Sequence, residues 1–569
     1  MHQEASEAIM GSDTVSIGLL ADFNVQNLSV LLQKSSRRYK VACAQAPFGQ
    51  TINLLLDRQA NFWSASYDAL VLWTMPERAV PSFSKVLGFE EYSLTELLQE
   101  VGAFAELVER ISEKVHTIIM PSWVAPGMER GWGALDLANG VGIGNALMRM
   151  NLALADRFEG NRRVVLLDAD RWMRTAGAGA FSPKLWYLSK TPYHRIVFQE
   201  AATDILAAID GIRGHSKKIV ILDLDNTLWG GIVGDIGWEK LRLGGHDSIG
   251  EAHVDFQVAL KRLANRGVVL AVVSKNEESV ALEAIRQHPE MVLRTDDFAG
   301  WRINWEDKAK NIVDLLSELN LGLESAVFLD DSPFERARVR DALPQVLVPD
   351  LPEDPAQYAV FLARLSLFDN PTVSAEDRRR NKMYIADRER IVLKREIASL
   401  GQWLEALALN VCVERLDHRN LERAAQLLNK TNQMNLKTRR MTASELMAWA
   451  QTDGHMVWTF RVWDRFGDYG LCGISSLAID GATGQIEDFL LSCRVMTRGI
   501  ENAMLATVAQ HARDIGCDVL SAEYIPSPKN SPCRSWLEST FFISLEGNRF
   551  IYSLRNPPLH PDHIQMSAQ

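Results

Sequence analysis

The feature that most constrains this chain is a pair of aspartates, one residue apart, directly after a short apolar segment. Residues 218–222 have the composition of a buried strand, and Asp223, Asp225 and Thr227 follow it before a Gly-Gly turn. A single Asp at a strand end is usually a turn cap. Two carboxylates crowded at this position repel each other, and burying them without a cation is costly. Because open α/β sheets place their chemistry at the carboxyl ends of strands, the pattern predicts a cation-dependent site there.

A second apolar segment, 269–273, ends in a run of polar residues that could hold phosphate. Ser274 and Asn276 offer a hydroxyl and an amide on either side of Lys275, and Lys308 begins a periodic helix further along. Taken singly, a serine after a strand is usually a turn residue and a lysine is usually solvated. Their order along alternating strands and helices favours a phosphate site with Lys308 as a fixed counter-charge.

A third apolar segment, 327–329, is followed by a second acidic pair, Asp330 and Asp331. Mg²⁺ prefers octahedral oxygen ligands from a few carboxylates, waters and substrate phosphate. The two acidic pairs therefore predict a magnesium site.

These motifs together resemble the haloacid dehalogenase-like phosphatases. The resemblance implies that Asp223 is the nucleophile that accepts the phosphoryl group and that Asp225 is the general acid and base. The metal ligands that it implies are Asp223, the backbone carbonyl of Asp225, and Asp331 or Asp330, with Asp331 favoured. The positions that would hold the substrate phosphate are Thr227, Ser274, Lys275, Asn276 and Lys308.

Composition describes an ordinary globular protein. The chain has 569 residues, 47% of them apolar, and a net charge of −11, which argues against nucleic acid as its partner. No apolar run is long enough to span a membrane, and the N-terminus lacks a signal pattern. The six cysteines include no CxxC pair. We therefore expect a cytoplasmic protein with free thiols.

The strand and helix signals divide the chain into four parts and predict a multidomain α/β protein. Residues 1–212 alternate strand and helix, as in a doubly wound α/β domain, and residues 213–352 form the phosphatase-like α/β domain. Residues 353–399 are a charged helical connector, for which a docking face is the alternative to solvated helices. Residues 400–569 have an α+β order that resembles the GCN5-related N-acetyltransferases (GNAT-like).

Two of these parts depart from the families they resemble. The first is similar to the SGNH hydrolases, but Phe23 stands where their serine would follow Asp22, and the block 168–171 lacks the expected histidine. We interpret it as a non-hydrolytic module. In the last part, Thr497 replaces the first glycine of the acetyltransferase pyrophosphate turn, which argues against acetyl-CoA binding.

Cys493 is the second candidate nucleophile. It lies at the end of an expected strand, 486–493, directly before Arg494 and a helix. A neighbouring arginine and a helix N-terminus both favour the thiolate. A buried structural cysteine is an equally good interpretation of spacing alone, so the residues leave both open.

Further runs extend the resemblance over nearly the whole chain, to the FkbH-like glyceryl transferase/phosphatases of polyketide and antibiotic biosynthesis. The runs are 223–231, 274–277, 328–333, 429–435, 465–468, 492–495 and 526–530. The resemblance implies an enzyme that takes a glyceryl unit from 1,3-bisphosphoglycerate, removes phosphate and loads the acyl group onto an acyl carrier protein. It also implies that Cys493 carries the acyl group, while Arg494 could stabilise the oxyanion.

The polar run 430–435 could hold a phosphate or a pantetheine arm through Lys430 and Asn432, or be a solvated loop. Arg439 and Arg440 could steer an acidic carrier protein. Two alternatives remain to the transferase/phosphatase: a phosphatase of a small phosphometabolite whose C-terminal domain only binds, and a scaffold that docks carrier proteins.

Overall fold

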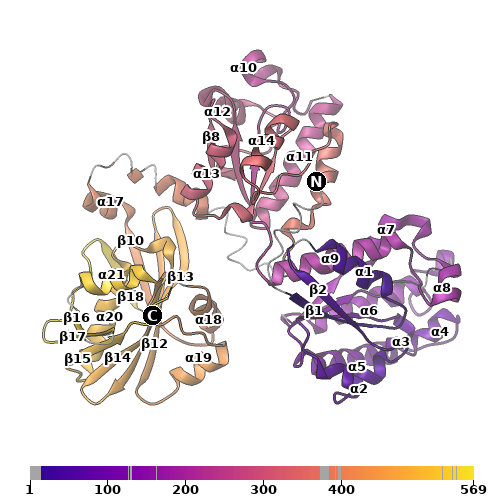
Figure 1. The fold of residues 1–569 in the computed structure, drawn as a ribbon, viewed down its shortest axis with the longest axis horizontal. Coiled ribbons are helices and arrows are strands. Elements are labelled where there is room, and N and C mark those ends of the chain that lie inside the picture. The colour runs from indigo at the N-terminus through magenta and orange to yellow at the C-terminus, as the bar shows by residue number, and fades with distance from the viewer. Residues whose placement is uncertain are drawn as a thin grey trace. The chain divides into compact units, whose positions relative to one another are not determined.

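The computed structural model describes most of the chain, and its strands form three β-sheets (Figure 1). The described residues are 14–36, 38–125, 127, 131–161, 163–245, 247–371, 383–390, 393–394, 397, 399–431, 433–527, 530–540, 542–545 and 548–568. They belong to two compact units. The first comprises Met1–Val268, Val272–Val292 and Arg302–Arg378, and the second comprises Val269–Ala271, Leu293–Trp301 and Arg379–Gln569.

The first sheet is parallel throughout, with the strand order β2-β1-β3-β4-β5. Alternate residues of its strands enter two separate apolar cores, one on each face: Ile17 and Leu19 of β1 in one core, Leu70 and Leu72 of β3 in the other. Burial on both faces explains the continuous apolar runs in the sequence. Its strands are β1 (Thr14–Ala21), β2 (Lys40–Gln45), β3 (Ala69–Trp73), β4 (Ile118–Pro121) and β5 (Val164–Leu167).

Nine helices of the described residues accompany this sheet, which is the doubly wound arrangement that the sequence predicts. They are α1 (Gln26–Ser35), α2 (Thr51–Leu56), α3 (Pro76–Ala79), α4 (Phe83–Leu87), α5 (Leu94–Ser112), α6 (Ile143–Arg157), α7 (Ala169–Ala176), α8 (Pro183–Ser189) and α9 (Arg195–Ile212).

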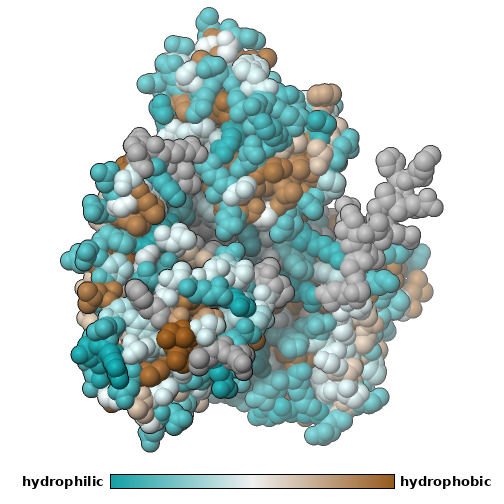
Figure 2. Space-filling view, turned by 60° about the vertical axis from the view of Figure 1, so that its left-hand side comes forward, coloured by the Kyte–Doolittle hydropathy of each residue, from teal (hydrophilic) through white to brown (hydrophobic). Residues whose placement is uncertain are grey.

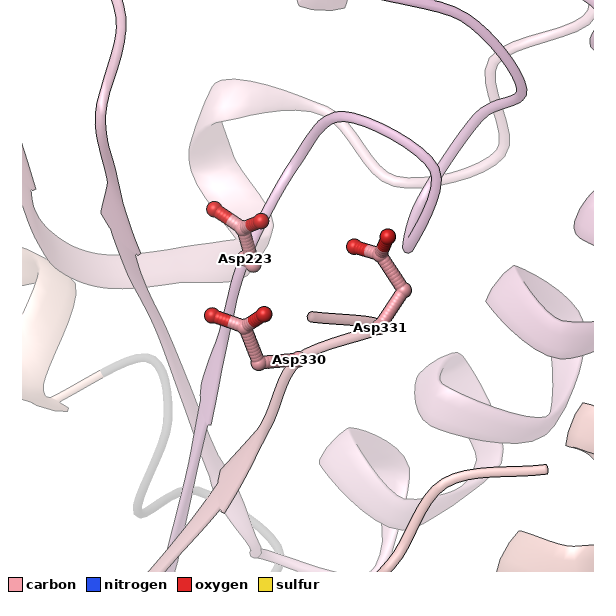
Figure 3. Close-up of side chains that lie close together, drawn as sticks. All are labelled: Asp223, Asp330 and Asp331. Atoms are coloured by element: carbon pink, nitrogen blue, oxygen red, sulfur yellow. The ribbon is translucent and has the colours of Figure 1, made fainter. Parts of the chain in front are cut away.

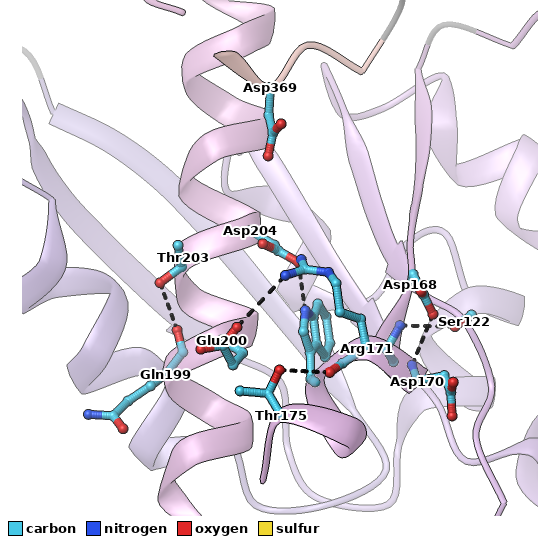
Figure 4. A network of polar contacts seen from close by, with 12 residues as sticks. Ser122, Asp168, Asp170, Arg171, Thr175, Gln199, Glu200, Thr203, Asp204 and Asp369 are labelled. Carbon is cyan, nitrogen blue, oxygen red and sulfur yellow. Dashed lines mark hydrogen bonds and ion pairs between the residues drawn. The ribbon is translucent and has the colours of Figure 1, made fainter. Parts of the chain in front are cut away.

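The block 168–171 has a structural role in this domain (Figure 4). Asp168 caps α7 by accepting a hydrogen bond from the Asp170 N–H. Arg171 and the Trp172 indole both donate to the buried carboxylate of Asp204 on α9, the indole at 2.6 Å. These contacts fix α7 against α9, consistent with a packing role for this segment.

The second sheet has the order β8-β7-β6-β9, with β6 and β9 parallel. Its strands are β6 (Ile219–Leu222), β7 (Val269–Ser274), β8 (Phe298–Ile303) and β9 (Ala326–Leu329). The helices are α10 (Val233–Ile236), α11 (Ser248–Asn265), α12 (Glu278–Gln287), α13 (Lys308–Glu318), α14 (Pro333–Ala342) and α15 (Tyr358–Ala363). Because β6 and β9 are adjacent and parallel, the acidic pairs that follow them meet at one edge of the sheet.

The sequence predicts solvated helices for the segment 353–399, but part of this segment is buried against α11 of the second sheet's domain. Tyr358 and Leu362 of α15 are buried, as is Phe368, and the Tyr358 ring contacts Phe256 of α11 edge to face. The arginine-rich run 378–380 lies outside the described residues.

The third sheet has nine strands in the order β16-β17-β15-β14-β13-β12-β10-β18, with β11 paired to β14. Its strands are β10 (Leu409–Arg415), β11 (Met434–Asn435), β12 (His455–Asp464), β13 (Gly467–Asp480), β14 (Thr483–Leu491), β15 (Val519–Glu523), β16 (Ile543–Leu545), β17 (Arg549–Ser553) and β18 (Ile564–Ala568). Its helices are α17 (Leu400–Leu407), α18 (Leu421–Lys430), α19 (Ala443–Ala450), α20 (Ile500–Asp514) and α21 (Ser531–Ser539).

On the face drawn in Figure 2, hydrophilic residues predominate and hydrophobic ones gather in separate patches. None of the described helices combines the length and the apolar character that a membrane crossing requires.

Candidate active site

Three aspartates meet at the carboxyl edge of the second sheet. Asp223 follows β6, and Asp330 and Asp331 follow the adjacent strand β9; Figure 3 shows their carboxylates pointing to the same side. One oxygen from each residue lies within 4.8 Å of the others. The two motifs, more than a hundred residues apart in sequence, therefore form one cluster.

Lys308 lies against this cluster. It is the first residue of α13, its side chain is buried, and its Nζ lies 2.6 Å from Asp330 Oδ2 and 3.0 Å from Asp223 Oδ1. Burial would lower the pKa of Lys308, but the charges of Asp223 and Asp330 outweigh it and raise that pKa. Burial and the Asp223 charge raise the pKa of Asp330 to about 6. Lys308 thus lies beside these carboxylates as a counter-charge, the position that the sequence predicts.

The two residues of the second acidic pair have different surroundings. Both carboxylate oxygens of Asp330 are engaged, one by Lys308 and the other by the Ser332 N–H at 2.8 Å. Asp331 Oδ1 accepts a hydrogen bond from the Thr227 hydroxyl at 3.1 Å. Burial and the Asp223 charge also raise the pKa of Asp331. Of the pair, Asp331 therefore has the greater freedom to ligate a cation.

The donor set fits a hard divalent cation. The Asp223 Oδ1 atom is buried and accepts no hydrogen bond of ordinary geometry, despite its closeness to Lys308. Carboxylate oxygens are the ligands that Mg²⁺ prefers, and the Asp223–Asp330–Asp331 cluster offers one from each residue.

Asp225 is held by three N–H donors. Oδ1 accepts from the Trp229 indole at 2.8 Å and from the Val233 N–H at 3.1 Å, and Oδ2 accepts from the Asn276 amide at 2.9 Å. Burial raises the pKa of Asp225, and the charges of Asp223 and Asp331 add to that rise. A raised pKa suits a group that must both give and take a proton.

Three residues that were not predicted from the sequence hold the loop that carries Asp225. Three consecutive carbonyls, those of residues 226–228, contact Tyr358 Oη, His253 Nδ1 and Gln257 Nε2 at 3.4, 3.1 and 2.8 Å. His253 and Gln257 lie one helical turn apart on the buried face of α11, a spacing that could have identified them as a pair. They hold the loop in place rather than face a substrate.

The residues that were expected to bind phosphate have different surroundings in the structure. Ser274 ends β7 with its side chain buried, and Thr227 is buried beside Asp331. Asn276 contacts Asp225, and Lys275 forms an ion pair with Glu335 at 2.7 Å. The structure thus brings together the carboxylates and Lys308 and engages Thr227, Lys275 and Asn276 with neighbouring side chains.

The second expected site lies in the C-terminal part of the chain. Strand β14 ends at Leu491, so Cys493 is not on it, contrary to expectation, but begins a short 3₁₀ turn, 493–495. The Cys493 and Lys430 side chains, and all of Asn432, lie outside the described residues. Arg494 Nη1 lies 3.5 Å from Met383 Sδ.

A buried charged cluster, here called the Arg390 cluster, lies in the same unit. It consists of Asp387, Arg390, Asp464, Tyr469 and Arg498. Arg390 binds Asp464 through two hydrogen bonds of 2.7 Å and Asp387 through one of 2.8 Å. Tyr469 donates to Asp464 at 3.0 Å and accepts from Arg498. Two carboxylates and two guanidinium groups balance each other.

The candidate steering residue Arg439 is also engaged. Its guanidinium forms an ion pair with the buried Asp488 and lies over the Trp449 ring. The expectation that Arg439 is free to attract a carrier protein is therefore not supported by its surroundings.

Comparison with known proteins gives one informative similarity. No family model matches the chain, and no curated protein does. A crystal structure of the N-terminal part of the protein BF1531 from Bacteroides fragilis, containing a phosphatase domain complexed with Mg, is 28% identical with a TM-score of 0.57. The match covers 65% of this chain and 99% of that one. This chain therefore shares its architecture with a protein that contains a phosphatase domain.

Acetyltransferases are also among the similar structures. The ribosomal-protein-S18-alanine N-acetyltransferase from Escherichia coli is 11% identical with a TM-score of 0.20, and covers 25% of this chain and 94% of its own. A GNAT-family acetyltransferase from Staphylococcus aureus Mu50 is 9% identical with a TM-score of 0.21, and covers 26% and 99%. Similarity at this level carries no argument about the activity of this chain.

Proposed function

We propose that this chain is a Mg²⁺-dependent phosphatase that transfers the phosphoryl group to Asp223. The observation that carries the proposal is the cluster of Asp223, Asp330 and Asp331 around the buried Lys308. Asp223, Asp331 and the Asp225 carbonyl would hold the cation, which would offset negative charge on the transferring phosphoryl group. The Mg in the BF1531 structure supports this choice of cation.

The residues divide the reaction between them. Asp223 attacks the phosphorus atom while Lys308 offsets the charge of the phosphoryl oxygens. Asp225 gives a proton to the leaving oxygen, and Ser274 at the end of β7 provides a hydroxyl for the phosphoryl group. Asp225 then takes a proton from the water that hydrolyses the phosphoenzyme.

The finer proposal concerns the substrate and the C-terminal unit. We propose that the chain takes a glyceryl unit from 1,3-bisphosphoglycerate onto Cys493 and delivers it to the pantetheine thiol of an acyl carrier protein. An acyl phosphate is already activated toward a thiolate, whereas the second phosphate is an ester that a thiol cannot displace. One substrate would therefore need both a thiol and the Asp223 site. Support for this step comes from the sequence runs shared with the FkbH-like enzymes.

Mass spectrometry of the purified protein, given 1,3-bisphosphoglycerate made in situ with Mg²⁺, tests the finer proposal. We expect a glyceryl or phosphoglyceryl adduct on the Cys493 peptide, absent in Cys493→Ala. Phosphate release without any thioester would leave the phosphatase proposal intact and contradict acyl transfer. The chain would then be a phosphatase of a small phosphometabolite, which is the second candidate because the geometry of the Asp223 site supports it without Cys493.

A further inference from the structure

The hydrogen bonds to Asp225 are unequal, and this inequality distinguishes its two oxygens. Oδ1 accepts two N–H donors, from Trp229 and Val233, whereas Oδ2 accepts one, from Asn276. A carboxylate oxygen has about two lone-pair sites in its plane. A proton on Oδ1 would therefore displace one of its two donors, whereas Oδ2 can take a proton and keep Asn276.

The donors themselves are fixed in place. Trp229 is fully buried, and its indole reaches back four residues to Asp225. Asn276 is also buried, follows β7, and donates to Oδ2, the other oxygen of Asp225. Val233 begins α10, so its N–H is one of the groups that a helix start leaves without an intrahelical partner. Both sides of the carboxylate are thus held by elements of the same domain.

We propose that Trp229 and Asn276 are positioning residues that fix Asp225 so that Oδ2 is the oxygen that exchanges the proton. This inference rests on the proposed phosphatase function. It gives Asn276 a role different from phosphate binding, because its amide already donates to Asp225.

The proton and electron balance of the step follows from this assignment. As the bond from Asp223 to phosphorus forms, the bond from phosphorus to the leaving oxygen breaks, and its electron pair stays on that oxygen. The leaving oxygen takes the proton from Asp225 Oδ2. In the second step water attacks phosphorus, its proton goes to Asp225 Oδ2, and the bond to Asp223 breaks to release phosphate.

A positioning role predicts a specific kinetic pattern. A leaving group that is already a stable anion needs little help from an acid, whereas an alkoxide needs a proton in the transition state. Misplacing Asp225 should therefore slow the phosphorylation step, measured as kcat/KM, for an alkyl phosphate and spare it for an aryl phosphate. A residue that binds the phosphoryl group, or one that only stabilises the fold, would affect both substrates alike.

The test compares Trp229→Phe and Asn276→Ala with the unaltered protein, using β-glycerophosphate and p-nitrophenyl phosphate with Mg²⁺. In each variant we expect kcat/KM, which reports the phosphorylation step, to fall about 30-fold for β-glycerophosphate and less than about 3-fold for p-nitrophenyl phosphate. Trp238→Phe is the matched control, because Trp238 contacts His288, and it should leave both rates unchanged.

Every other outcome would contradict the inference, and each indicates a different role for Trp229 and Asn276. Equal losses with the two substrates would assign Asn276 to phosphate binding and Trp229 to packing. Unchanged rates would show that Asp225 needs neither residue. If Trp229→Phe does not fold, Asn276→Ala alone carries the test. An unaltered protein that hydrolyses neither substrate would instead contradict the proposed phosphatase function.

Discussion

Two clusters of buried charge in this chain use the same residue types and differ in balance. In the Arg390 cluster two carboxylates meet two guanidinium groups, and Asp464 is satisfied by Arg390, Tyr469 and the backbone N–H groups of residues 466 and 467. At the edge of the second sheet, Lys308 pairs with Asp223 and Asp330, and Asp225 and Asp331 add negative charge close by.

The pKa of Asp464 shows this difference, although burial raises the pKa of Asp387 in the same cluster. Burial would raise the pKa of Asp464, but Arg390 outweighs it and lowers that pKa. Burial and neighbouring carboxylates raise the pKa values of Asp225, Asp330 and Asp331. A cluster in which every buried charge has a partner stabilises its fold. A cluster in which carboxylates outnumber cations keeps negative charge that can bind a cation and, through it, a phosphoryl group. The comparison suggests that buried charge marks function where it is unbalanced.

The largest expected effect is on catalysis at the unbalanced cluster. Asp223→Asn should lower phosphate release by at least about 10⁴-fold, because an amide cannot form the phosphoenzyme. The fold should survive, since the change removes a repelling charge. Steady-state phosphate release and circular dichroism measure the two effects. Activity within tenfold of the unaltered protein would remove Asp223 from the reaction.

At the Arg390 cluster we expect the opposite result, a loss of stability without a loss of catalysis. Asp464→Asn should destabilise the C-terminal unit by about 3–5 kcal/mol, because it leaves the buried Arg390 without its main counter-charge. Hydrolysis of p-nitrophenyl phosphate should be unchanged. Urea denaturation and the phosphatase assay check the two statements. A variant that lost hydrolysis but kept its stability would instead make the Arg390 cluster part of the reaction.

Mg²⁺ should stabilise the unit that contains the unbalanced cluster. At a hundred times its dissociation constant a ligand of the native state adds about 2.7 kcal/mol. We expect this gain in denaturation experiments with Mg²⁺ against chelator, and its loss in Asp331→Asn. NaCl at matched ionic strength is the control, and an equal gain from NaCl would show general screening instead of a site.

The pH dependence of stability should be the smallest effect. The pKa of Asp330 in the folded protein is raised to about 6. The stability that protonated Asp330 contributes is therefore fully present below the unfolded pKa near 4 and is lost as pH rises through 6. Metal-free protein should therefore be more stable near pH 5 than near pH 7.5, by about 1.4 kcal/mol. Mg²⁺ should remove the difference. Greater stability near pH 7.5 in chelator would contradict the assignment.

Much of the fold could be predicted from sequence where strands are buried on both faces. Strand β3, Ala69–Trp73, is of this kind, because five apolar residues in a row suit a parallel strand. Strand β8 was missed, since Phe298–Ile303 mixes glycine and arginine with apolar residues. Edge strand β18 was missed too: it is half polar and pairs with β10 across about 150 residues of sequence.

The candidate site was predicted in part for a similar physical reason. Acidic residues at strand ends can be recognised locally, so Asp223 and Asp331 were found. Tyr358 lies 132 residues from the loop it supports, and only the folded chain brings the two together. Trp229 is four residues from Asp225 and could have been identified as its partner, but a buried tryptophan after a strand is ordinarily core.

The most direct test of Asp223 as the nucleophile is mass spectrometry of protein that is quenched in acid after mixing with p-nitrophenyl phosphate and Mg²⁺. Asp225→Asn should be used alongside the unaltered chain, because slow hydrolysis would let the phosphoenzyme accumulate. We expect an added phosphoryl group on the peptide that contains Asp223, and none in Asp223→Asn. Turnover with no phosphorylated peptide, or a phosphoryl group on a residue outside this peptide, would contradict it.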